Sequence, residues 1–313
     1  MINRELIRIK VVQLVYAYYQ NSNRPIETVE KELIFSLSKA YELYAYLLQL
    51  IVAITAEERH RLEINTARAE REGTEKPSDR FVCNQFAMQL EDNSQLLEMI
   101  QTRGLTWSND VDFIRILCDK IEQTPEYQAY MALETTDYAT DKELWRKLYK
   151  QVLQNNEDLE SVLEEKSIYW NDDKTTVDTF VIKTIKRFEQ ENGSEQQLLP
   201  EFKDEEDKQF ALKLFKDAIV GAETYQQYMT DASKNWDLSR LAYMDLVIMQ
   251  IAIAEMLNFP NIPVSVTINE YVELAKVYST PKSGSYINGM LDSIARHLIA
   301  EHILLKPMPQ KTN

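Results

Sequence analysis

The chain has 313 residues, of which 44% are hydrophobic, so it can bury a core of domain size and is not disordered throughout. Its formal net charge of −15 makes the surface acidic as a whole, so any contact with nucleic acid requires a local basic patch. Only 6 residues are glycine and 9 are proline, which favours long helices over many short strands joined by tight turns.

The cysteines and the apolar stretches indicate a protein of a reducing, aqueous compartment. Cys83 and Cys118 form no Cys-x-x-Cys pair and have no histidine nearby, so they predict neither a zinc site nor redox chemistry. The first ten residues alternate charged and apolar groups, unlike a signal peptide. The longest apolar stretches, 43–56 and 241–257, are interrupted by polar residues, which favours buried helices over membrane spans. We therefore expect a cytoplasmic protein that has no contact with a membrane.

The first predicted helix covers residues 3–20. An apolar stripe recurs along it at spacings of three and four residues, at Ile2, Leu6, Ile9, Gln13 and Tyr16. Arg4 and Arg8 lie on another face. Residues 1–24 hold four basic groups and one acidic group, a net charge of +3 against −18 for the remainder. This face is either an ordinary solvated helix surface or a contact for a polyanion, and composition alone favours the former.

The middle of the chain is predicted to be helical as well. A long helix over 27–70 begins apolar and becomes charged after Glu57. Shorter amphipathic helices are predicted at 80–101, 109–122, 141–154, 156–166 and 174–190. Turn signals such as Gly104 and Thr124-Pro125 separate them.

Helix starts are clearer in the C-terminal third. One long helix is predicted over 204–232, and Asp237 is placed to cap a central apolar helix over 238–257. Thr267 and Glu270 have the spacing of a capping box, which predicts a helix that begins at 268. A last helix is predicted over 284–304, followed by a loose tail at 306–313. The whole pattern predicts an all-α fold.

Motifs of catalysis are scarce. Glu57-x-x-His60 is half of a di-iron motif, but no second copy exists, and a solvated helix end is the better interpretation. His297 and His302 are five residues apart and do not form the metal-binding pattern of a helix. The sequence contains no phosphate-binding glycine loop and no local signature of a Ser or Cys nucleophile. We therefore predict a non-catalytic protein that holds neither a cofactor nor a metal.

Asn288-Gly289 is unusual because glycine within a helix costs about 1 kcal/mol relative to alanine. Either helices crowd there or a partner or nucleotide approaches the backbone closely, and the sequence leaves both possibilities open. Lys282 and Tyr286 precede the pair and could offer RNA a charge and a stacking ring.

Two blocks of the chain resemble the NusB family of bacterial transcription antitermination factors. In residues 1–20, Arg4 and Arg8 fall on the family's Arg-rich positions, and Val12-Gln13-Leu14-Val15-Tyr16 matches its first helix. In residues 204–304, Ile262-Pro263, Val266, Ile268-Asn269-Glu270 and Tyr286-Ile287-Asn288-Gly289-x-Leu291-Asp292 match its strongest signatures. Glu5 and Leu6 stand where the family is often basic.

The resemblance implies a bundle of helices with an insertion that short family members lack. It divides the chain into an N-terminal part at 1–55, an insertion of open role at 56–200, a C-terminal part at 201–305 and the tail.

The resemblance also implies binding of boxA, a single-stranded element of ribosomal RNA leaders, jointly with the ribosomal protein NusE. Other Nus factors would then link the complex to elongating RNA polymerase. RNA would meet Arg4, Arg8, Lys10, Lys282, Tyr286 and Asn288. The protein partner would meet Tyr16, Tyr19 and Asp245, and the pattern of the first helix favours a core position for Tyr16.

Two other functions are compatible with parts of the sequence. NusB-like domains are also fused to ribosomal RNA methyltransferases, but the glycine-rich loop that such a catalytic domain needs is not found in this sequence. Alternatively, the chain is a helical protein–protein adaptor that has lost selective RNA binding and works through its insertion.

Overall fold

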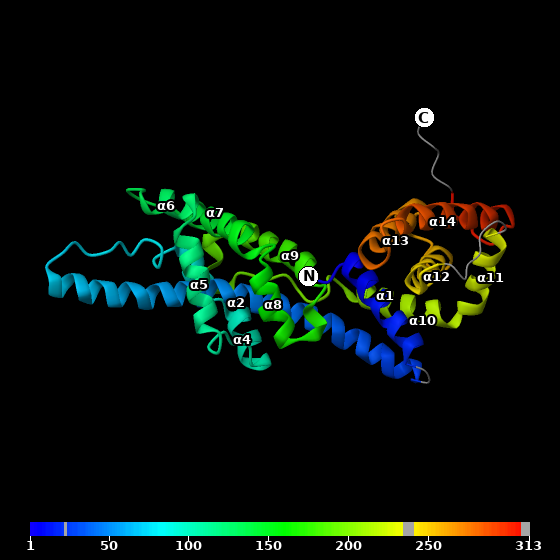
Figure 1. Cartoon of the computed structure of the whole chain (residues 1–313), viewed down its shortest axis with the longest axis horizontal. Coiled ribbons are helices and arrows are strands. Elements are labelled where there is room, and N and C mark those ends of the chain that lie inside the picture. Colours follow the sequence, from blue (N-terminus) through cyan, green and yellow to red (C-terminus); the bar gives the residue numbers. More distant parts are fainter. Residues whose placement is uncertain (22–23, 234–240, 308–313) are drawn as a thin grey trace, which may run out of the picture. The chain divides into compact units, whose positions relative to one another are not determined.

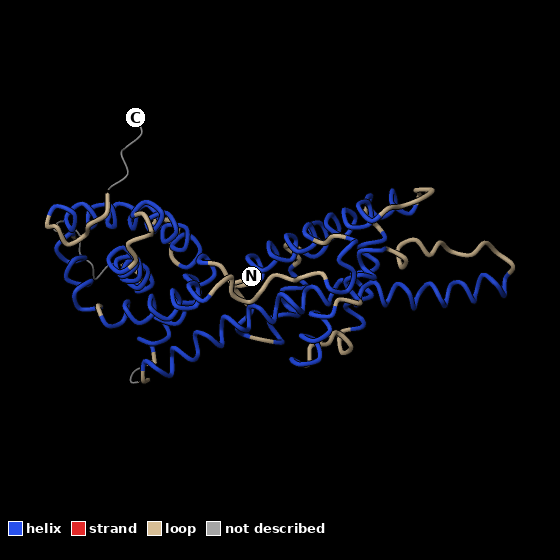
Figure 2. The backbone as a smooth tube through the Cα atoms, turned by 180° about the vertical axis from the view of Figure 1, so that it is seen from behind, coloured by secondary structure: helices blue, strands red, loops and turns tan. Residues whose placement is uncertain are grey.

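The computed structural model describes residues 1–21, 24–233 and 241–307, and within these ranges the chain is built from helices with no strand (Figure 2). An isolated bridge pairs Ile2 with Phe202. The predicted all-α fold is therefore confirmed. The chain divides into two compact units. The inserted unit comprises residues 38–201 together with residue 1, and the terminal unit comprises residues 2–37 and 202–313.

The terminal unit is arranged around one central helix, α12 (Tyr243–Asn258) (Figure 1). Its neighbours are α1 (Arg4–Gln20), α10 (Glu205–Val220), α11 (Ala222–Ala232), α13 (Val264–Tyr278) and α14 (Ser283–Ala300). All five pack against α12, which explains why that helix is apolar on nearly every side. The unit also contains the first residues of α2 (Ile26–Glu72).

The inserted unit is organised along the remainder of α2. Its other helices are α3 (Gln85–Glu91), α4 (Ser94–Arg103), α5 (Val111–Glu122), α6 (Pro125–Met131), α7 (Tyr138–Leu148), α8 (Glu157–Lys166) and α9 (Lys174–Arg187). A π-helical turn, Tyr149–Leu153, extends α7, and short 3₁₀ turns follow α8 and α9. The C-terminal end of α2 extends past its neighbours in this unit, and the loop after it runs back alongside (Figures 1 and 2).

α2 is also long and apolar enough in one 18-residue window to cross a membrane, judged by length and composition alone. Within the protein, 61% of that window is buried. Leu43, Leu47, Leu50, Ile51 and Ile54 have no exposed surface. These side chains belong to the core, as expected for a central helix of a bundle.

The single helix predicted over 204–232 is wrong, because it breaks at Gly221 into α10 and α11. The ring of Tyr225 occupies the place where a Cβ at position 221 would lie. The Tyr225 hydroxyl accepts a hydrogen bond from Asn258 Nδ2 at 3.2 Å, which fixes that ring against α12. Glycine at 221 is therefore required by packing.

The predicted capping box at Thr267 and Glu270 is also wrong. α13 begins at Val264, after Pro263, whose carbonyl accepts the N–H groups of Val266 and Thr267. The Thr267 hydroxyl donates instead to Glu255 on α12. A buried carboxylate from another helix is thus the partner of the presumed capping side chain.

Several other boundaries differ from the sequence prediction. The helix predicted over 80–101 is two helices, each capped by an asparagine, Asn84 and Asn93. Thr124-Pro125 is not a plain turn, because Thr124 caps α6 and Pro125 occupies its first position. α12 begins at Tyr243, while the predicted cap Asp237 lies outside the described residues.

The loose tail does not begin at position 306. Lys306 is buried, and its Nζ donates to the carbonyl of Ile262 at 2.9 Å. Residues 308–313 lie outside the described part of the chain.

Candidate functional site

Arg8 is the most buried of the arginines predicted to meet RNA. Its Nε donates to Glu255 Oε2 at 2.8 Å, and its Nη2 donates to Glu255 Oε1 at 3.0 Å. Its Nη1 donates to Glu270 Oε2 at 3.0 Å. Burial by itself disfavours the charged form, but the hydrogen bonds and charge of Glu255 outweigh it and raise the pKa of Arg8. The prediction that Arg8 faces phosphate does not agree with this placement. The Arg8 guanidinium is already paired with Glu255 and Glu270 inside the terminal unit.

Glu255 also accepts hydrogen bonds from two side chains of α13. Thr267 Oγ1 donates to it at 2.8 Å and the Tyr271 hydroxyl at 3.1 Å, both from α13. Glu255 has no exposed surface, and burial raises the pKa of Tyr271 well above its ordinary value. A buried carboxylate needs such a full set of donors, so this network ties α1, α12 and α13 together.

Lys10 and Arg4 have opposite surroundings. Lys10 is 1% exposed, so it does not offer a charge to solvent, contrary to its predicted role at phosphate. The Arg4 side chain is 35% exposed. It pairs with Glu206 at 2.6 Å and with Asp207 at 3.4 Å, and its guanidinium lies 5.0 Å from the centre of the Phe210 ring. Of the three basic residues of α1, Arg4 alone reaches the surface.

The start of α14 presents the remaining predicted RNA residues. Lys282 and Asn288 are exposed, and Tyr286 is half-buried. Gly289 is exposed as well, and a Cβ built there would meet nothing within 4 Å. Among the described residues no other helix crowds this glycine, and close approach of a partner stays a prediction.

Asp245 on α12 holds the first residue of α14 through a buried hydrogen bond. It is 4% exposed, and its Oδ2 accepts a hydrogen bond from Ser283 Oγ at 2.9 Å. The Ser283 hydroxyl also accepts from the backbone N–H of Thr280 at 3.2 Å. The burial of Asp245 does not agree with its predicted role as a direct partner contact, because its carboxylate holds the loop that carries Lys282.

An aromatic patch lies where α1 meets the first turn of α12. The rings of Tyr16 and Tyr243 have centroids 5.7 Å apart, and those of Tyr19 and Tyr243 are 6.5 Å apart. The Tyr19 hydroxyl accepts from Gln250 Nε2 at 2.7 Å, and burial raises the pKa of Tyr19. Tyr243 is 42% exposed and was missed from the sequence, because the predicted helix start at 238 placed it in the helix interior. Tyr16 and Tyr19 are thus half-buried, with part of each side chain exposed to solvent.

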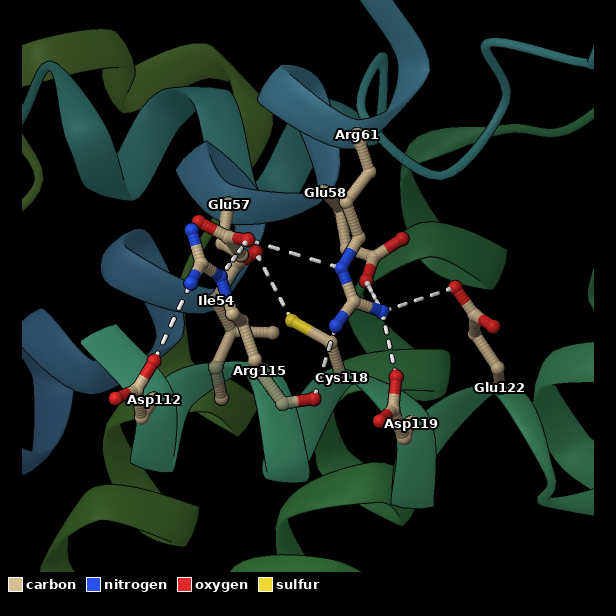
Figure 3. Close-up of polar contacts among 9 residues, drawn as sticks. All are labelled: Ile54, Glu57, Glu58, Arg61, Asp112, Arg115, Cys118, Asp119 and Glu122. Carbon is tan, nitrogen blue, oxygen red and sulfur yellow. Dashed lines mark hydrogen bonds and ion pairs between the residues drawn. The ribbon is translucent and has the colours of Figure 1, made fainter. Parts of the chain in front are cut away.

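A second polar cluster surrounds Arg61 in the inserted unit (Figure 3). Arg61 Nη1 donates to Asp119 Oδ1 at 2.8 Å and lies 3.5 Å from both Glu58 and Glu122. Its Nε lies 3.7 Å from Glu57. One guanidinium therefore holds four carboxylates from α2 and α5 together.

Cys118 and Glu58 lie at the inner side of this cluster. Burial, and then the neighbouring Glu58, raises the pKa of the Cys118 thiol, and burial also raises the pKa of Glu58. The thiol contacts the carbonyl of Ile54 at 3.9 Å (Figure 3). A protonated thiol of this kind is a packing group rather than a nucleophile.

The structure brings no metal-binding group together around His60 or elsewhere within 1–21, 24–233 and 241–307.

Comparison with known proteins matches α9 of the inserted unit and the C-terminal helices of the terminal unit to one family. The NusB family model matches residues 174–296. The transcription antitermination protein NusB of Salinibacter ruber is 33% identical over 120 residues, which are 36% of this chain and 75% of that protein. The same protein of Dictyoglomus turgidum is 43% identical over 88 residues, 28% of this chain and 61% of that protein. That of Natranaerobius thermophilus is 50% identical over 72 residues, 23% of this chain and 52% of that protein.

No solved structure matches the chain. The family match does not reach α1, but the contacts of Arg8 with Glu255 and Glu270 place α1 in the same unit as the matched helices α12 and α13. The match to the Salinibacter ruber relative spans three quarters of its length, so this chain belongs to the NusB family.

Proposed function

We propose that this chain is a non-catalytic, cytoplasmic transcription antitermination factor that binds a single-stranded boxA-type segment of ribosomal RNA leaders with a NusE-type ribosomal protein. Its relatives carry the name transcription antitermination protein. Other Nus factors would link the complex to elongating RNA polymerase. The observation that carries the RNA proposal is the exposed surface at the start of α14.

On that surface, helical spacing places Lys282, Ser285 and Gly289 on one face, with Asn288 beside them. Single-stranded RNA is recognised by stacking and by hydrogen bonds to base edges. The Lys282 ammonium suits a phosphate, the Asn288 amide suits a base edge, and the ring of Tyr286 suits stacking. Gly289 leaves the helix backbone open to close approach, which would compensate for its poor helix propensity.

The distribution of charge removes the main objection to RNA binding. Residues 38–201 hold 19 basic and 32 acidic residues, a net charge of −13, which leaves −2 for the rest of the chain. The acidity that repels nucleic acid is therefore concentrated in the inserted unit. A nearly neutral terminal unit offers few phosphate contacts, which implies modest affinity and a shallow salt dependence.

Lys282 and Arg4 are the phosphate contacts that we retain. Both reach the surface, and Arg4 would exchange its partners Glu206 and Asp207 for phosphate. We leave Arg8 and Lys10 out of the RNA surface because both are buried.

The aromatic patch of Tyr16, Tyr19 and Tyr243 is the proposed contact for the NusE-type protein. Tyrosine is enriched in protein interfaces because an apolar ring and a polar hydroxyl suit a half-wet surface. Tyr243 is 42% exposed and its ring packs edge-on against Tyr16, so the patch is already ordered. Asp245 would act only indirectly, by holding Ser283.

The test is a titration of the full chain with a boxA-like single-stranded RNA and with a scrambled RNA of the same composition. Each titration is run with and without the NusE-type protein, at several salt concentrations. For Lys282→Ala, we expect the slope of log affinity against log salt to fall by about 0.7–1, because one phosphate contact is lost. The matched control is Lys216→Ala, an exposed lysine of α10.

Three outcomes separate the possible functions. Selective binding that the partner strengthens and that Lys282→Ala weakens supports the proposal. Equal binding of both RNAs, or equal loss in the Lys216→Ala control, contradicts it. Binding of the NusE-type protein without selective RNA binding would identify the chain as a protein–protein adaptor instead.

A further inference from the structure

A groove of the inserted unit lies between α6 and α7 and has a volume of about 670 Å³. This volume lies within the range of sites that bind ligands or anchor side chains. Its walls are largely apolar, formed by Pro125, Ala129, Tyr130, Leu133, Ala139 and Leu144. Leu133 is 39% exposed, so part of this apolar lining is open to water.

The groove is held open by buried polar contacts. The Tyr130 hydroxyl donates to Asp141 Oδ1 at 2.7 Å, which fixes α6 on α7. Asp141 has no exposed surface, and its Oδ2 accepts the backbone N–H of Gln85 at 2.8 Å. Arg80 donates to the carbonyls of Met131 and Glu134 at the far end of α6. A partner would therefore meet a preformed site and lose little entropy in ordering it.

The rim of the groove is negatively charged. It carries Glu126, Asp137 and Glu143 against one cation, Lys147. Glu143 is paired with Arg146, and Asp137 caps α7 by accepting from the N–H of Thr140. Glu126 Oε2 is buried but accepts no hydrogen bond within the described part of the chain. The Glu126 carboxylate lines the groove, and a cationic donor from outside would pair with it once the side chain turns its buried Oε2 outward.

The charge of the surroundings selects the class of partner. The inserted unit carries a net charge of −13 over residues 38–201, which repels the phosphates of RNA or DNA and attracts a basic protein. Ala129 and Ala139 are small, so a helix backbone can come close to the groove. Apolar side chains at i, i+3 or i+4 and i+7 of such a helix would fill it.

We propose that the α6–α7 groove of the inserted unit binds a basic, amphipathic helix of a protein partner, with apolar anchors in the groove and a lysine or arginine at Glu126. This site would give the insertion a role that is separate from the RNA surface on α14.

The probe is a labelled helical peptide of about 18 residues with leucines at the anchor spacing and lysines on both flanks, since shorter isolated helices are marginal. Its twin carries glutamates in place of the lysines. Binding to the full chain is followed by fluorescence anisotropy. For Ala129→Leu, which places a bulkier side chain in the wall of the groove, we expect affinity to fall at least about tenfold. For Glu126→Gln we expect a loss of about threefold to tenfold, together with a weaker salt dependence.

Matched controls are Ala67→Leu on the exposed face of α2 and Glu164→Gln on α8, and neither should change binding. Thermal melting by circular dichroism checks that each variant is folded. The proposal is overturned if the lysine peptide does not bind, if the glutamate twin binds equally well, or if Ala129→Leu has no effect. It is also overturned if the groove instead accepts only a small apolar dye, or if Ala129→Leu abolishes self-association of the chain.

Discussion

Arg8 and Glu255 are 247 positions apart in the sequence and form a two-point ion pair in the interior of the terminal unit. The Glu255 carboxylate has no exposed surface, and the Arg8 side chain is 5% exposed. The pair joins the first helix of the chain to the central one. It therefore makes α1 a structural part of the NusB-family unit rather than an attached arm.

We expect Arg8→Met to lower the free energy of unfolding by about 3–5 kcal/mol, because the Glu255 charge would stay buried without its main partner. Urea denaturation followed by circular dichroism measures the loss. The control is Arg4→Met, whose half-exposed ion pairs are worth at most about 1 kcal/mol. Equal losses in the two variants would show that burial of the Arg8 pair has no special weight.

Glu58→Gln should stabilise the protein in a pH-dependent manner. Burial raises the pKa of Glu58, so the folded protein binds this proton more tightly than the unfolded chain does. The stability that Glu58 contributes is therefore fully present below its unfolded pKa of about 4.3 and is lost as the pH rises through the folded pKa. The glutamine variant cannot ionise and escapes this loss, while Arg61 keeps Glu57, Asp119 and Glu122 as partners.

The measurement is the urea midpoint of both proteins across the acidic to neutral range. The two should be similar near pH 4, and the variant should be the more stable one at neutral pH. Glu164→Gln, an exposed change, should show no such divergence. A variant that is less stable at neutral pH would indicate that ionised Glu58 is a net stabilising partner of Arg61.

Gly289→Ala should change folding stability and RNA affinity in opposite directions. A Cβ at this exposed position meets nothing within 4 Å, so alanine should raise stability by up to about 1 kcal/mol through helix propensity alone. RNA affinity should fall in the same variant if the backbone there is approached closely. Thermal melting and RNA titration together make the test.

The matched glycine is Gly221. Gly221→Ala should cost about 1–3 kcal/mol because the Tyr225 ring occupies the space that the new methyl group needs. A Gly289→Ala variant that is both stabilised and unchanged in RNA affinity would remove Gly289 from the proposed RNA surface.

Ser283→Ala should cost about 1–3 kcal/mol, because buried Asp245 would lose the hydroxyl donor at its Oδ2. The loop that carries Lys282 would lose its anchor, so RNA affinity should fall in parallel. Denaturation and RNA titration of the same preparation test both effects. Ser293→Ala, an exposed change on α14, is the control for stability.

The helical class and most helix positions could be predicted from local patterns, because apolar spacing and the scarcity of glycine and proline are properties of neighbouring residues. Thr124-Pro125 predicts a turn, but the same two residues begin α6, because a capping residue followed by proline is typical of turns and of helix starts. Gly221 looked like an interior helix residue because its reason, the ring of Tyr225, depends on packing against Asn258.

At the candidate site, too, contacts between residues distant in sequence could not be predicted from local patterns. Lys282, Asn288 and Gly289 are exposed, and their contact with RNA stays a prediction. Helical spacing places Arg8 outside the apolar stripe of the first helix. It cannot predict that the Glu255 carboxylate of α12 packs against that face. The Thr267 capping box failed for the same reason, since Glu255 took its hydroxyl. Predictions from neighbouring residues fail at positions where a side chain pairs with a buried charge from a distant part of the sequence.

The split of the terminal unit around residues 38–201 has a consequence for synthesis. At ribosomal rates of about 5–20 residues per second, Glu255 emerges roughly 12–50 s after Arg8. Until α10 and then α12 have emerged, the apolar side chains of α1, including Leu6, Val11 and Val15, lack the surfaces that bury them. The inserted unit, by contrast, is complete in sequence long before. We therefore expect α1 to remain without its main packing partners until the C-terminal part of the terminal unit has been synthesised.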